Sequence, residues 1–121
     1  MTRPVDAAFE RLVQGQLSQP ATGPTDGWEA KLPGGQTVAR STLQAEARPL
    51  IELGPGAVPD LLPWVHHANA AIRYVAMFAL EQITGEHAKI SYFDDDRAQQ
   101  DAAIATWRRW YEQHIAKHPR S

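Results

Sequence analysis

The chain has 121 residues, enough for one domain of about 100 to 200 residues, and a formal net charge of −2. Its 12 basic and 14 acidic residues are nearly balanced, which excludes a polycationic nucleic-acid coat and an acidic disordered tail. The absence of cysteine excludes disulfides and thiolate chemistry, and an apolar fraction of 43% suffices for a hydrophobic core.

The first element expected along the chain is an N-terminal helix within residues 1–17. Val5, Phe9 and Leu12 recur at helical spacing, and Pro4 suits a first helical turn, where its missing N–H would be unpaired anyway. No apolar run reaches the length of a secretory signal or a membrane span. We therefore expect a cytoplasmic protein that does not contact a membrane.

Residues 18–40 are too rich in proline and glycine for a long helix. Trp28, Ala30 and Leu32 alternate with charged residues, and Pro33–Gly35 offers turn chemistry before Thr37. This pattern fits a small β-hairpin. An irregular loop that pins one tryptophan to the core fits the same residues, and both interpretations remain open.

A helix is expected over residues 41–53. Ser41 and Gln44 have the spacing of a capping box, in which each side chain satisfies a backbone N–H of the first turn. Pro49 should kink or divide this helix, because proline removes a backbone hydrogen bond. Gly54 should end it.

Two further helices are expected over residues 57–66 and 70–84. Pro63 should bend the first near its end, and Asn69 and Gly85 suit the N-cap and the C-terminal stop of the second. The segment 70–84 is apolar nearly all round, so it should lie at the centre of the molecule with neighbours on two sides.

Residues 86–95 form the expected linker to a last helix over residues 96–118. Ile104 and Trp107 lie on its apolar stripe and should face the core. As the final element, this helix should cap the fold.

The stretch from residue 45 to residue 84 resembles the HEAT-like helical repeats, and the tail from residue 94 is similar to the closing helix of small bacterial proteins with such repeats. The matching positions are Leu53-Gly54, Ala57-Val58-Pro59, Leu61-Leu62, Ile72-Arg73, Ala76, Ala79-Leu80 and Ile83. The resemblance implies an all-α fold of about five helices in a short right-handed α-α stack. Residues 41–85 would be its core, and the first and last helices its caps.

One position departs from the family pattern. The family often carries an aspartate six residues before the arginine, and the two side chains link successive repeats. This chain has His67 there. The resemblance therefore predicts that Arg73 lacks its usual partner.

Four histidines could be read as metal or acid–base groups. His114 and His118 are four residues apart on a predicted helix, but no third potential ligand occurs at a spacing that is characteristic of a metal site. His66 and His67 point in different directions, and hydrogen bonding at a helix end or between helices explains them better. We expect no catalytic residue, no metal and no cofactor.

The expected function is non-catalytic protein–protein interaction through a helix face and the 18–40 loop, in an adaptor or an inhibitor such as an immunity protein. We expect no nucleic-acid partner, because the basic cluster near the C-terminus is small. One alternative is a metal-binding or small-molecule-processing accessory protein using His66, His114 and His118. Another is a structural module that self-associates, as a homodimer for example. The candidate contact residues are aromatic, apolar or arginine side chains: Trp28, Leu32, Arg73, Tyr92, Arg109 and Trp110.

Overall fold

The computed structural model describes residues 4–16, 29–35, 37–67, 69–86 and 97–116. Within them the fold is mostly helical with one small antiparallel sheet, so the all-α prediction is confirmed. The α-helices are α1 (Pro4–Val13), α2 (Arg40–Glu52), α3 (Val58–Leu61), α4 (Ala70–Thr84) and α5 (Arg97–Tyr111). The shorter elements are β1 (Glu29–Lys31), β2 (Thr37–Ala39), the 3₁₀ turns η1 (Pro55–Ala57) and η2 (Leu62–His66), and the π-helical turn η3 (Glu112–Ala116).

The described part of residues 18–40 is a β-hairpin rather than an irregular loop. Ala30 pairs with Val38 in an antiparallel register, and the Gly35 N–H donates to the Leu32 carbonyl at 2.9 Å to close the turn. Ala30, Leu32 and Val38 are buried, which attaches the hairpin to the core. Trp28 lies outside the described residues.

The expected capping box at Ser41 is wrong. The N-cap of α2 is Ala39, and no side chain caps this end. Because β2 ends at Ala39 and α2 begins at Arg40, the strand itself supplies the extended backbone that an N-cap needs. Pro49 lies inside α2 without dividing it.

The segment from Val58 to His66 changes from an α-helix to a 3₁₀ turn at Leu62, one residue before Pro63. The prediction that Pro63 disturbs this helix is thus confirmed as a tightening of its last turn. The next helix, α4, has the predicted bounds. The Asn69 side chain accepts a hydrogen bond from the Ile72 N–H at 3.1 Å, and Gly85 adopts the left-handed conformation, with φ of 75°, that ends the helix.

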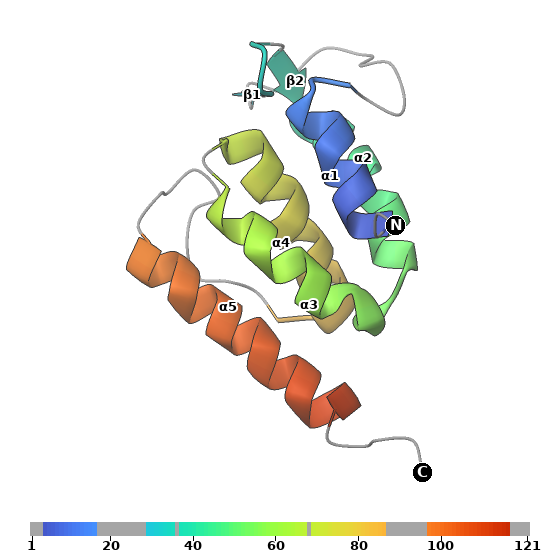
Figure 1. The fold of residues 1–121 in the computed structure, drawn as a ribbon, viewed down its shortest axis with the longest axis vertical. Helices are drawn as coiled ribbons and strands as arrows, with labels where there is room; N and C mark the ends of the chain where they lie inside the picture. Colours follow the sequence, from blue (N-terminus) through green and yellow to red (C-terminus); the bar gives the residue numbers. More distant parts are fainter. Residues whose placement is uncertain (1–3, 17–28, 36, 68, 87–96, 117–121) are drawn as a thin grey trace.

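Helix α4 is the centre of the molecule, as its apolar sequence predicted. Figure 1 shows α1 and α2 on one side of α3 and α4, and α5 on the other side. Contacts from α4 reach α1, α2, α3, η2 and α5 as well as β1. Nearly every residue of α4 up to Glu81 is therefore buried. In the described part of the chain, no helix is long and apolar enough to cross a membrane.

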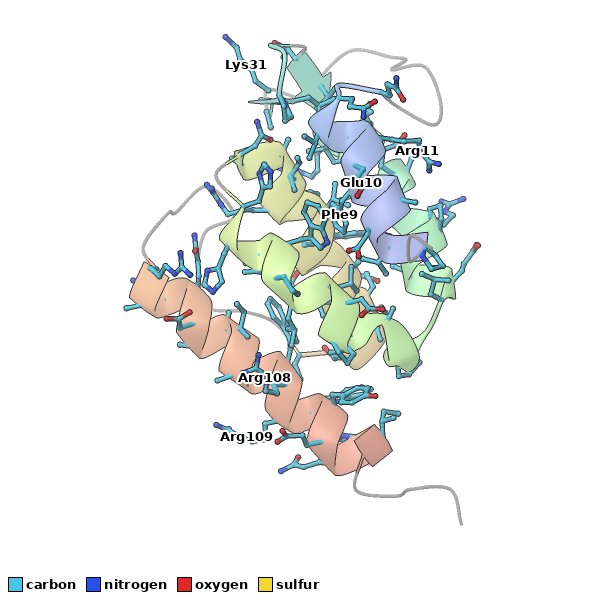
Figure 2. The ribbon with its side chains drawn as sticks, in the orientation of Figure 1. Phe9, Glu10, Arg11, Lys31, Arg108 and Arg109 are labelled. Atoms are coloured by element: carbon cyan, nitrogen blue, oxygen red, sulfur yellow. The ribbon has the colours of Figure 1, made fainter. Side chains whose placement is uncertain are left out.

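An aromatic contact joins helix α1 to η2. The ring of Phe9 stacks on Trp64, with centroids 4.6 Å apart, and the Trp64 Nε1–H donates to Asp6 Oδ1 at 3.1 Å. Figure 2 shows Phe9 pointing from α1 toward the rest of the molecule and Arg11 pointing away from it. The amphipathic pattern of the N-terminal segment thus matches its buried and exposed sides.

Candidate functional site

A pocket of about 280 Å³ lies where α5 packs against α3 and η2, and we call it the α3–α5 groove. Its wall on the α3–η2 side consists of residues at helical spacing: Pro59, Leu62, Pro63 and His66. Its wall on α5 also consists of residues at helical spacing: Asp101, Ile104 and Arg108. The two walls run antiparallel (Figure 1), so that residues near the end of η2 face residues near the start of α5.

Polar contacts of His66 with two residues of α5 span one end of the α3–α5 groove. His66 Nε2 lies 2.9 Å from Asp101 Oδ1, and His66 Nδ1 lies 2.9 Å from Gln100 Oε1. Gln100 is buried, whereas the Asp101 side chain is 63% exposed. His66 therefore links η2 to α5 with both ring nitrogens, which confirms the prediction that it makes hydrogen bonds between helices.

The middle of the groove is apolar. Leu62 and Ile104 are buried and form its floor, while Pro59 and Pro63 are exposed at its edge. Proline carries no N–H, so these two residues present ring carbons without a backbone donor that would need a partner. An apolar side chain bound here would be removed from water on several of its sides, which favours its binding.

The opposite end of the groove carries a positive charge. Arg108 is exposed, and no hydrogen bond or ion pair to its guanidinium exists within the part of the chain that the structure describes. Figure 2 shows the side chains of Arg108 and its neighbour Arg109 on α5. Only Arg108 of the two lines the groove, because consecutive helical residues point about 100° apart.

A second polar network lies beside the groove, at the start of α4. Asn69 caps α4 and also donates through Nδ2 to the Lys31 carbonyl at 2.9 Å, which ties the hairpin to this helix end. The buried Arg73 donates from Nη1 to the His67 carbonyl at 2.9 Å. Arg73 thus does have a partner at position 67, but the acceptor is the backbone instead of a carboxylate side chain.

The His67 ring takes part in the same network as an acceptor. Its Nδ1 accepts a hydrogen bond from the Asn69 backbone N–H at 3.0 Å, and the ring stacks on Trp64. Burial lowers the pKa of His67, and the positive charge of Arg73 lowers this pKa further. Both effects favour the neutral ring that the hydrogen bond at Nδ1 requires.

These contacts predict that His67 makes the protein less stable as the pH falls. In the unfolded chain the ring takes up a proton near its ordinary pKa of 6.5, whereas the folded chain resists protonation because its pKa is lower. The stabilisation is present above pH 6.5 and declines as the pH drops toward the folded pKa. We expect the urea midpoint to fall between pH 7.5 and 5.5, and to fall less in His67→Asn, whose amide oxygen can accept the same N–H. Equal pH dependence in both proteins would contradict this role.

The structure describes four of the six candidate contact residues of the sequence analysis, and none of the four lines the α3–α5 groove. Leu32 and Arg73 are 2% and 3% exposed, so they support the interior and present no binding surface. Arg109 is exposed and Trp110 is half-buried, but neither lines the α3–α5 groove. The remaining two, Trp28 and Tyr92, lie outside the described residues.

The groove itself was not found by sequence reasoning, although His66 was singled out. Pro59 and Leu62 were interpreted as positions of the family pattern and Ile104 as a core residue. The spacing of residues along a helix shows which face each occupies but not which faces meet. The one available signal was the pair of prolines, Pro59 and Pro63, four residues apart and therefore on one side of the expected helix.

Two histidines of the metal-binding alternative, His66 and His114, have other partners. The His114 ring stacks on Trp110, with centroids 4.6 Å apart, and its Nδ1 donates to the Trp110 carbonyl at 2.9 Å. His118 lies outside the described residues. Among the residues that the structure does describe, no group of three or more histidine or acidic side chains is arranged to hold a metal ion.

Comparison with known proteins found no relative of this chain. No protein-family model matches the chain, and no curated protein and no solved structure matches it either.

Proposed function

We propose that this protein is a non-catalytic protein-binding module and that its α3–α5 groove holds a short segment of a partner protein. The observation that carries the proposal is the combination of a buried apolar floor, Leu62 and Ile104, with exposed prolines at its edge. Such a surface favours apolar side chains, while the polar groups at its two ends provide orientation.

The size of the groove suits one or two side chains of a protein segment. Its volume of about 280 Å³ lies just below the range of about 300 to 1,000 Å³ that is usual for ligand pockets. A side chain of leucine size and part of its neighbour would fill it. The nearest polar pair, His66 and Asp101, is engaged in joining η2 to α5.

We also propose that residues 45–84 form a HEAT-like helical hairpin. The support is that Arg73 contacts the residue six positions earlier, where the family often carries the linked aspartate, and does so here through the backbone carbonyl of His67. A role as an adaptor or as an inhibitor of the immunity-protein type, in the cytoplasm of a bacterium, agrees with a small helical binder. The 18–40 segment would add contacts next to the start of α4.

A charge placed at the edge of the groove should weaken partner binding. We expect Pro63→Glu to weaken the binding of peptides selected from a random library on the wild-type protein by about tenfold, because an apolar side chain would have to desolvate the new carboxylate. Calorimetric titration of each selected peptide measures the ratio. Pro63 is exposed at the first turn of η2, so the substitution should leave the fold intact.

The matched control is Ala105→Glu, which adds the same charge to an exposed position of α5 that does not line the groove. Its affinity should stay within about twofold of the wild type. Peptides that bind Pro63→Glu as well as they bind the wild type, or a library that enriches no peptide sensitive to Pro63→Glu, would refute the proposed function.

A further inference from the structure

We infer that the α3–α5 groove selects partner segments in which an apolar side chain and a carboxylate lie two residues apart in extended conformation. This inference rests on the proposed function and adds the chemistry of the partner. It follows from the order of groups along the groove, which runs from the His66–Asp101 pair through Leu62 and Ile104 to Arg108.

The spacing of the α5 residues sets the spacing in the partner. Ile104 and Arg108 are four residues apart on one helix face, which corresponds to a rise of about 6 Å along the helix axis. In an extended peptide, side chains at positions i and i+2 point to the same side and are about 7 Å apart. A leucine seated on Ile104 would therefore place a glutamate two residues away beside Arg108.

The charges at the two ends decide where the carboxylate goes. Asp101 is a largely exposed acid, so it repels a second carboxylate at the His66 end. Arg108 is an exposed cation that no described side chain or backbone group engages, and its guanidinium can bind a carboxylate through two parallel hydrogen bonds. The acidic side chain of the partner thus belongs at the Arg108 end.

The test compares two symmetric peptides, which match the groove in either chain direction. One is acetyl-Ser-Leu-Ser-Glu-Ser-Leu-Ser-amide, and the other has glutamine in place of glutamate. Methyl NMR shifts of Leu62 and Ile104 report binding in the groove. We expect the glutamate peptide to bind about fivefold more tightly at low salt, a gain near the upper end for one exposed ion pair.

Two variants assign this preference to one side chain. Arg108→Gln should abolish the difference between the peptides, whereas Arg109→Gln, the same change one residue along α5, should keep it. A glutamate preference that survives in Arg108→Gln would overturn the inference.

The peptide pair also separates this inference from the proposed function. Equal binding of the two peptides to the wild type would overturn the acidic preference and leave the groove as a binding site. The same conclusion would follow if library-selected peptides that lack an acidic residue bound the groove while neither the glutamate peptide nor the glutamine peptide bound it. Failure of the selected peptides in the Pro63→Glu comparison would instead remove the proposed function, and this inference with it.

Discussion

Replacing Trp107 with alanine is expected to lower the free energy of unfolding by about 4 kcal/mol, within the range of about 3 to 5 kcal/mol for a buried aromatic residue. Trp107 is completely buried and is the largest of the fully buried side chains within the described residues. Its Nε1–H also donates to the Glu86 carbonyl at 3.0 Å, which joins α5 to the backbone just beyond α4. The substitution would leave a cavity and an unpaired carbonyl together.

Urea unfolding followed by circular dichroism measures this change, and Trp110→Ala provides the matched control. Trp110 lies three residues along the same helix but is only half-buried, so its loss should cost about 1 to 2 kcal/mol. Equal destabilisation by the two substitutions would show that Trp107 does not anchor α5 in the way its burial implies.

Replacing Arg73 with methionine is expected to lower the free energy of unfolding by about 3 kcal/mol. The methionine keeps most of the apolar volume, but the groups that the buried guanidinium engages, the His67 carbonyl among them, lose their donor. The link between the start of α4 and the residues before it would be broken. Arg73→Lys keeps a charge but not the planar donor geometry, so an intermediate loss is expected.

Arg48→Met is the control for this second substitution. Arg48 is an exposed residue of α2, and the same change there should alter the free energy of unfolding by no more than about 0.5 kcal/mol. The same urea unfolding experiment compares all three variants. An Arg73→Met protein as stable as Arg48→Met would show that the buried guanidinium contributes nothing net to the fold.

The sequence predicted the helices well where local chemistry determines their ends. Asn69 and Gly85 bound α4 because a side-chain oxygen and a left-handed glycine act on their own helix termini. Ser41 failed as a cap for the opposite reason. The pairing of β2 with β1 extends the backbone up to Ala39, and this pairing brings together segments that no local signal connects.

The candidate site was beyond sequence reasoning for a similar physical cause. Its walls come from η2 and α5, and the contact of His66 with Gln100 spans 34 positions of the chain. Helical spacing identified Ile104 as an inward residue but did not show that Leu62 would lie opposite it. The partner of Arg73 was also hidden, because a backbone carbonyl leaves no trace in the amino-acid sequence.

The acceptor that Arg73 uses has a consequence for how position 67 can vary. A carboxylate partner would demand an acidic residue there, but a main-chain oxygen belongs to all twenty amino acids. A substitution at position 67 can therefore keep the hydrogen bond from Arg73, while it replaces the titratable imidazole ring with another side chain. The pH dependence of stability at the start of α4 can thus change through position 67, while the hydrogen bond between Arg73 and the main chain is kept.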